Sequence, residues 1–192
     1  MRIGLFGGSF DPIHNGHLKL ALDSKINFNL DKVIFIPAKI PPHKKTKILA
    51  KSNHRTRMIL TAIKPYPFFS LSRYEINKKS TTYTFNTLRY FEKKYPNADI
   101  FFLIGSDSLN ELKSWKNIGD FKTLCSFIVA QRKGYKPDKN NKYLKNAYFT
   151  KNEIQNISSS SIRNLIKKGK TVSGLVPKSI ETYIIKKKLY IK

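Results

Sequence analysis

The stretch that decides the fold is MRIGLFGGSFDPIHNGH, residues 1–17. Arg2 to Phe6 has the composition of a short buried strand, and a glycine-rich turn follows through Gly16. From His17 to about Ile26 the apolar residues are spaced as on a helix. The chain therefore opens with a strand, a glycine-rich turn and a helix.

The same alternation continues to the end of the chain. Further strands are expected at 33–36, 68–71, 100–104 and 127–130, with a polar loop over 38–52. Helices are expected at 53–63, capped by Ser52 or Asn53, at 84–95, from the serine run 158–161, and at 177–187 with Pro177 in the first position. This order predicts an α/β fold, a Rossmann-like doubly wound parallel sheet with helices on both faces, which binds ligands at the carboxyl ends of its strands.

Composition limits the class of protein without deciding its function. The 192 residues contain no repeat or linker, so we expect one domain over 1–192, and 40% hydrophobic residues argue against disorder. No apolar run is long enough for a membrane helix, and the N-terminus lacks a signal peptide, which predicts a cytoplasmic protein. The single cysteine, Cys125, is expected to be a buried apolar residue, not a reactive thiol.

The net charge of +25 permits two interpretations. A basic protein of this kind can bind nucleic acid, but the lysines are scattered and no nucleic-acid motif is present, so we expect no nucleic-acid partner. Codon bias accounts for the lysines equally well, and a polyphosphate substrate would benefit from the positive field. The charge alone does not choose between these explanations.

The first loop has the chemistry of a phosphate site. Its glycines, Gly7 and Gly8, let the backbone approach a ligand, and N–H groups near Ser9 and Phe10 can face phosphate oxygens. His17 lies in the first helical turn, and His14 precedes it by three residues, so both imidazoles can converge on one anion. The loop is neither a Walker A sequence nor a dehydrogenase fingerprint, and a zinc site would lack further ligands.

This loop resembles the Gly-Gly-Ser/Thr-Phe-Asp-Pro-x-His-x-Gly-His motif of adenylyltransferases that make dinucleotide cofactors. The segment 157–163, ISSSSIR, resembles the Ile-Ser-Ser-Thr-x-Ile-Arg motif of the same superfamily. Hydroxyls and unpaired N–H groups at a helix start, with Arg163 one turn later, can hold the outer phosphates of ATP. Taken alone, Ser158 is equally well an ordinary helix N-cap and Arg163 a solvated side chain.

Four further strings resemble bacterial nicotinate mononucleotide adenylyltransferases: PPHK at 41–44, YTFNTL at 83–88, Gly105-Ser106-Asp107 with Leu112 and Trp115, and Arg132 with Gly134 and Tyr135. Thr84 at a helix start can receive the nicotinate carboxylate, and Trp115 offers a face to the pyridine ring, unless it is a core residue. Asp107 can accept hydrogen bonds from ribose hydroxyls, unless it is a helix N-cap.

The resemblance implies transfer of AMP from ATP to nicotinate mononucleotide, with release of pyrophosphate. It implies catalytic roles for His14, His17 and Arg163. It implies ATP contacts at Gly7, Gly8, Ser9, Phe10, His14, Gly16, His17, Gly105, Asp107, Ile157, Ser158, Ser159, Ser160 and Arg163. It implies contacts to the mononucleotide at Ser9, Lys44, Tyr83, Thr84, Phe85, Trp115, Lys116 and Arg132.

The same resemblance implies Mg²⁺ bound mainly through the ATP phosphates, with no dedicated metal ligands in the protein. The C-terminal helical part, about 157–192, is expected to complete the ATP site. Nicotinamide mononucleotide and phosphopantetheine remain alternative acceptors, and a basic nucleic-acid-binding module remains the alternative of another class. The oligomeric state is left open, a homo-oligomer included.

Overall fold

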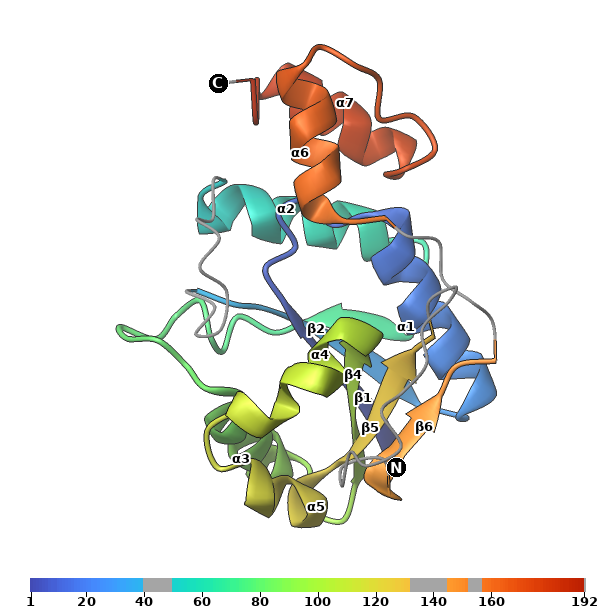
Figure 1. Ribbon diagram of the computed structural model, residues 1–192, viewed down its shortest axis with the longest axis vertical. Coiled ribbons are helices and arrows are strands. Elements are labelled where there is room, and N and C mark those ends of the chain that lie inside the picture. Colours follow the sequence, from blue (N-terminus) through green and yellow to red (C-terminus); the bar gives the residue numbers. More distant parts are fainter. Residues whose placement is uncertain (40–49, 132–144, 152–156, 192) are drawn as a thin grey trace.

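The computed structural model describes residues 1–39, 50–131, 145–151 and 157–191, without the side chains of Asp107 and Asn110. Its centre is a six-stranded sheet in which every strand pairing is parallel (Figure 1). The strands are β1 (Arg2–Gly8), β2 (Lys32–Pro37), β3 (Phe69–Leu71), β4 (Asp99–Gly105), β5 (Ser126–Ala130) and β6 (Ala147–Phe149), in the order β3-β2-β1-β4-β5-β6. The predicted doubly wound parallel sheet is confirmed.

The helices alternate with the strands as expected. They are α1 (Asn15–Asn27), α2 (Ser52–Ile63), α3 (Thr84–Lys94), α4 (Ser106–Glu111), α5 (Phe121–Leu124), α6 (Ser159–Lys167) and α7 (Lys178–Lys186), with 3-10 turns at Leu112–Ser114 and Ile118–Asp120.

Two capping predictions are wrong. Lys51 occupies the N-cap position of α2 without a side-chain capping bond, and Pro177 lies at the N-cap of α7, one residue before its first turn.

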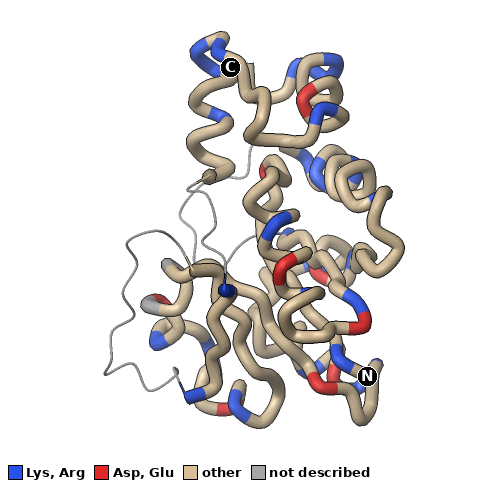
Figure 2. The backbone as a smooth tube through the Cα atoms, turned by 90° about the vertical axis from the view of Figure 1, so that its right-hand side faces the viewer, with Lys and Arg blue, Asp and Glu red and all other residues tan. Residues whose placement is uncertain are grey.

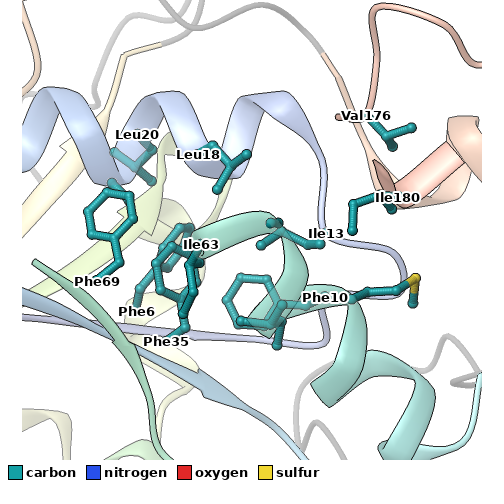
Figure 3. Close-up of a cluster of buried hydrophobic side chains, with 14 of the residues drawn as sticks. Phe6, Phe10, Ile13, Leu18, Leu20, Phe35, Ile63, Phe69, Val176 and Ile180 are labelled. Atoms are coloured by element: carbon teal, nitrogen blue, oxygen red, sulfur yellow. The ribbon is translucent and has the colours of Figure 1, made fainter. Parts of the chain in front are cut away.

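The core has two layers because alternate residues of each strand point to opposite faces of the sheet. One cluster of buried side chains, part of it drawn in Figure 3, joins β1, β2, β4 and β5 to α1, α2, α6 and α7. The second joins the opposite faces of the same strands to α3, α4 and α5. Both faces are thus covered, as buried parallel sheets require.

The strand order reverses between β1 and β4. The chain runs outward from β1 to β2 and β3, then crosses back to place β4 on the other side of β1. Carboxyl ends of strands at such a reversal form the crevice where doubly wound folds bind ligands. The loop after Gly8 and the turn after Gly105 therefore meet at the expected place.

Helices α6 and α7 lie beyond the edge of the sheet, over α2 and the loop that follows β1 (Figure 1). Ile162, Ile180 and Ile184 are buried in the same cluster as α1 and α2, so this C-terminal part shares the main core. Figure 2 shows Lys and Arg distributed over most of the described elements. No helix in the described ranges is long and apolar enough to cross a membrane.

Cys125 lies immediately before β5 and is buried. Burial raises the pKa of its thiol well above the ordinary value, because a thiolate would lose its hydration there. The expected role as a buried apolar residue agrees with this placement.

Candidate active site

The loop Ser9–His14 is held by hydrogen bonds to its carbonyl oxygens. The oxygen of Ser9 accepts from Arg55 Nη1 at 2.7 Å, that of Asp11 from Arg163 Nη1 at 2.8 Å, and that of Pro12 from Ser159 Oγ at 2.9 Å. In a trans peptide the carbonyl and the next N–H point in opposite directions. The N–H of Phe10 is therefore turned away from Arg55, an orientation suited to facing a ligand.

Phe10 itself anchors this loop. It has a φ of 46°, in the left-handed region that residues other than glycine rarely adopt, and its ring is 1% exposed. Its ring packs edge-on against Phe6 and lies 5.6 Å from Phe35, between ring centroids. Such a conformation persists only where packing holds it, and strained backbone of this kind is common at functional sites.

Packing within the protein explains why positions 7 and 8 are glycines. A Cβ atom on Gly7 would lie 3.0 Å from Cζ of Phe102, and one on Gly8 would lie 3.1 Å from Cζ of Phe10. Both positions face rings of the protein itself, so the absence of a side chain here permits close packing. The close approach of a ligand to the backbone of these glycines stays a prediction.

The two histidines of the loop converge as predicted. Their rings stack with centroids 3.6 Å apart and planes inclined by 24°. His14 is the N-cap of α1, and each backbone N–H donates to Nδ1 of the other ring, at 3.3 Å for His17 and 3.2 Å for His14. Because both Nδ1 atoms accept, the proton of each neutral ring is on Nε2. The capping interaction thus fixes the tautomer of both rings.

The second motif lies at the start of α6. Ser158 is indeed its N-cap: Ser158 Oγ accepts from the N–H of Ser161 at 3.0 Å, and Ser161 Oγ accepts from the N–H of Ser158 at 3.3 Å. Ser160 accepts from Arg163 Nη2 at 3.2 Å. Ile157, a predicted ATP contact, is buried in the core cluster.

Arg163 is not the solvated side chain considered as an alternative, since its side chain is only 15% exposed. It donates to the carbonyl of Asp11, and Ser159 donates to that of Pro12, so the start of α6 is bonded directly to the first loop. The two sequence motifs expected to bind one ATP, about 150 residues apart in the chain, are therefore adjacent in space.

Sequence reasoning missed a buried group of charges behind the loop. Asp11 is 1% exposed, and its Oδ1 accepts from Tyr190 Oη at 2.8 Å and from the N–H of Ala50 at 3.2 Å. Arg55 is also 1% exposed. Burial lowers the pKa of its guanidinium, while the charge of Asp11 opposes this effect.

One sequence signal could have revealed Arg55. It occupies the apolar face of α2, at helical spacing before Met58, Ile59 and Ala62, which are all buried. An arginine on such a face must be buried with its charge, and a buried charge needs a partner.

Phe85 and Trp115, two of the expected mononucleotide contacts, pack against the second cluster, on the other face of the sheet. Tyr83 is the N-cap of α3 and Thr84 its first residue, as predicted, and Lys116 Nζ lies 4.8 Å from the centre of the Tyr83 ring. Phe85 and Trp115 are brought together around Phe121, at centroid distances of 6.4 Å and 6.1 Å.

Trp115 also packs edge-on against Phe102, with ring centroids 6.0 Å apart. It is only partly buried against the second cluster, so both the core role and the ring-stacking role fit its position. The N-cap alternative for Asp107 is wrong, because Gly105 is the N-cap of α4 and Asp107 is its second residue. Lys44, Arg132, Gly134, Tyr135 and the side chain of Asp107 lie outside the described residues.

A further buried group connects the end of β3 to α3. Glu75 is 8% exposed, and Thr87 Oγ1 donates to its Oε1 at 2.6 Å. Burial raises the pKa of this carboxyl to about 7, although the bond from Thr87 opposes the shift. Thr87 is the second threonine of the YTFNTL string, so Glu75 supports the helix that carries the expected mononucleotide contacts.

Comparison with known proteins shows the family of this chain. A sequence model of the cytidylyltransferase-like family matches residues 5–165. The chain is 38% identical to a probable nicotinate-nucleotide adenylyltransferase of Clostridium novyi, over 97% of this chain and 98% of that one. It is 39% identical to one from Clostridium acetobutylicum, over 97% and 98% of the two chains.

A solved structure supports the fold independently. The nicotinic acid mononucleotide adenylyltransferase of Plasmodium falciparum, complexed with NaAD, superposes with a TM-score of 0.81 at 24% identity, covering 99% of this chain and 97% of that one. At this identity the likeness concerns the fold alone.

Proposed function

The chain belongs to the cytidylyltransferase-like family and, within it, to the nicotinate-nucleotide adenylyltransferases, and from this premise we propose that it transfers AMP from ATP to nicotinate mononucleotide. One observation of the structure carries the proposal. The loop Ser9–His14 and the start of α6 are joined by direct hydrogen bonds, from Ser159 to Pro12 and from Arg163 to Asp11, at the sheet's point of reversal. Both are anion-binding arrangements, and together they suit a polyphosphate.

In the proposed reaction an oxygen of the mononucleotide 5′-phosphate attacks the α-phosphorus of ATP. The new P–O bond forms as the bond from the α-phosphorus to the bridging oxygen breaks, and pyrophosphate leaves with that electron pair. The attacking oxygen is already anionic, so the step requires no general base. Catalysis then consists of positioning the two phosphates and stabilising the charge of the transition state.

The histidines suit this second task. With Nδ1 engaged by the backbone, the Nε2–H of each ring has a fixed direction, and we propose that it donates to the α-phosphate in the transition state. Arg163 and the hydroxyls at the start of α6 would hold the β- and γ-phosphates. The N–H groups of the first turn of α6 add to the same field.

The nicotinate ring would lie near the start of α3. Thr84 and the N–H groups of that first turn would receive the substrate carboxylate, and Trp115 would border the ring. A carboxylate bound in this way would be favoured over an amide, which carries no charge.

Mg²⁺ would enter with ATP, where it neutralises phosphate charge. Within the described ranges no group of three His, Cys, Asp or Glu side chains could hold a metal ion. We propose that the ion is bound mainly by ATP oxygens and water, because Mg²⁺ usually keeps several waters and binds through substrate phosphates, and that the protein's own residues act on the phosphates.

The test is pyrophosphate release from ATP with nicotinate mononucleotide, nicotinamide mononucleotide or phosphopantetheine supplied in parallel. We expect the nicotinate substrate to give the highest kcat/KM. Preference for another acceptor would contradict the role of Thr84 while retaining the phosphate chemistry. Release with none of the three would contradict the proposed function.

A further inference from the structure

The last residues of the described chain lie against the first loop, Ser9–His14. Tyr190 is 8% exposed and donates its hydroxyl to Oδ1 of Asp11, across 179 positions of sequence. The turn that brings it there has two residues in the left-handed region, Lys188 at φ 49° and Tyr190 at φ 66°. Such conformations are costly for residues other than glycine and persist where surrounding contacts fix them. The tail is thus held in a defined position.

Asp11 connects this tail to the phosphate site. Its Oδ1 accepts from both Tyr190 and the N–H of Ala50, and its Oδ2 lies 4.0 Å from Arg163 Nη1. The same Arg163 nitrogen donates to the Asp11 carbonyl. A rotation of the Asp11 carboxylate or backbone would therefore move the guanidinium expected to bind ATP.

The phenol acts here as a donor. Burial raises the pKa of Tyr190 well above its ordinary value, and the adjacent charge of Asp11 raises it further, so the hydroxyl keeps its proton at any working pH. A hydrogen bond from a neutral donor to a buried carboxylate is among the stronger kinds in proteins.

We propose that Tyr190 is a positioning residue for the ATP site, because its hydrogen bond to Asp11 sets the orientation of the first loop and of Arg163. The inference rests on the proposed function, since it assigns a role in binding and turnover of ATP. Tyr190 itself touches no reacting atom in this scheme. It acts through Asp11.

The chain provides a matched control in Tyr183. Its hydroxyl shares a 2.9 Å hydrogen bond with Nδ1 of His54, which joins the C-terminal part to α2. That bond does not involve the first loop or Arg163. Tyr183→Phe and Tyr190→Phe therefore each remove one hydroxyl from the same C-terminal part, but only the second removes a bond to Asp11.

The experiment measures kcat and the KM for ATP of the intact protein and of both variants, together with their urea unfolding curves. We expect Tyr190→Phe to lower kcat/KM for ATP about tenfold, as for the loss of one hydrogen bond to a charged group, and to leave the KM for nicotinate mononucleotide nearly unchanged. Tyr183→Phe should lose stability to a similar extent and keep its ATP kinetics.

If kcat/KM for ATP falls equally in both variants, the cause is lost stability and the positioning role is overturned. If it is unchanged in both, the Tyr190 bond has no effect on ATP and the role is overturned as well. A rise in both KM values for Tyr190→Phe would also overturn it. Failure of the proposed function looks different, since the unmodified protein would then release no pyrophosphate. If Tyr190→Phe does not fold, Asp11→Asn tests the same link, because it replaces the charged acceptor of the Tyr190 hydroxyl by a weaker, neutral one. We expect a raised KM for ATP from a folded protein, and an unchanged KM would overturn the proposal.

Discussion

Stability should depend on pH through Glu75, and Glu75→Gln should remove that dependence. The carboxyl is buried and its pKa is raised from 4.5 to about 7, chiefly by burial. In the described part of the chain it forms no ion pair, and its side-chain partner is the hydroxyl of Thr87. Glutamine keeps an oxygen that can accept this hydrogen bond but cannot ionise.

The sign follows from which state holds the proton. Between pH 4.5 and about 7 the folded protein keeps the Glu75 proton, whereas the unfolded chain has released it. The stabilisation is therefore complete below pH 4.5 and is lost as the pH rises through 7. The pKa difference between the unfolded and folded states corresponds to about 3 kcal/mol of stability, because each pKa unit is worth about 1.4 kcal/mol.

The assay is urea unfolding of the protein and of Glu75→Gln at pH 5 and pH 8. Other groups titrate in this range, so the quantity of interest is the difference between the two proteins. We expect the variant to gain about 2–3 kcal/mol relative to the original protein on going from pH 5 to pH 8. Glu92→Gln, which changes an exposed carboxyl paired with Arg89, is the control. A difference that does not vary with pH would refute the reasoning.

Three further substitutions test the site and the core. His17→Ala should lower kcat on the order of 10²-fold, through loss of a fixed donor, and unaltered turnover would remove His17 from the mechanism. Arg163→Lys should raise the KM for ATP about tenfold, because an ammonium cannot replace the fork that reaches both Asp11 and Ser160; an unchanged KM would contradict this. Gly7→Ala should destabilise the fold by about 1–3 kcal/mol in urea unfolding, since its Cβ would meet Phe102, and a neutral effect would show that the ring moves aside.

The main strands and helices were predictable because local patterns match what the fold buries. Runs such as Ile100–Ile104 become β4, and the apolar spacing of residues 53–63 becomes α2. Three short elements, β6, α4 and α5, were missed, because so few positions are not enough to show a period. The cap of α2 was also missed, because Ser52 and Asn53 are of types that favour N-caps, whereas the helix already begins after Lys51.

The site was predictable only where its residues are consecutive in the chain. The first loop and the serine run are recognisable because their residues form continuous sequence motifs. Arg55, Glu75 and Tyr190 belong to no motif, and the sequence contains many other charged and aromatic residues. What distinguishes them is burial beside a partner far away in the sequence, and this is a property of the fold. The reason for Gly7 and Gly8 also needed the structure, because a glycine in a sequence does not reveal what its missing Cβ would meet.

Several of the hydrogen bonds that hold the C-terminal part in place are made to the loop Ser9–His14. Ser159, Arg163 and Tyr190 all bond to residues of the loop, and Asn15, at the start of α1, donates through its backbone and its side chain to the carbonyls of Leu175 and Gly174. Local opening of α6 and α7 would therefore separate the two parts of the proposed phosphate site before the sheet unfolds. A ligand that bridges the first loop and α6 binds more tightly when α6 and α7 are packed against the loop. By linkage, the bound ligand stabilises that packing by the same free energy. Added ATP should thus protect the amides of α6 and α7 from hydrogen exchange more than those of the central strands.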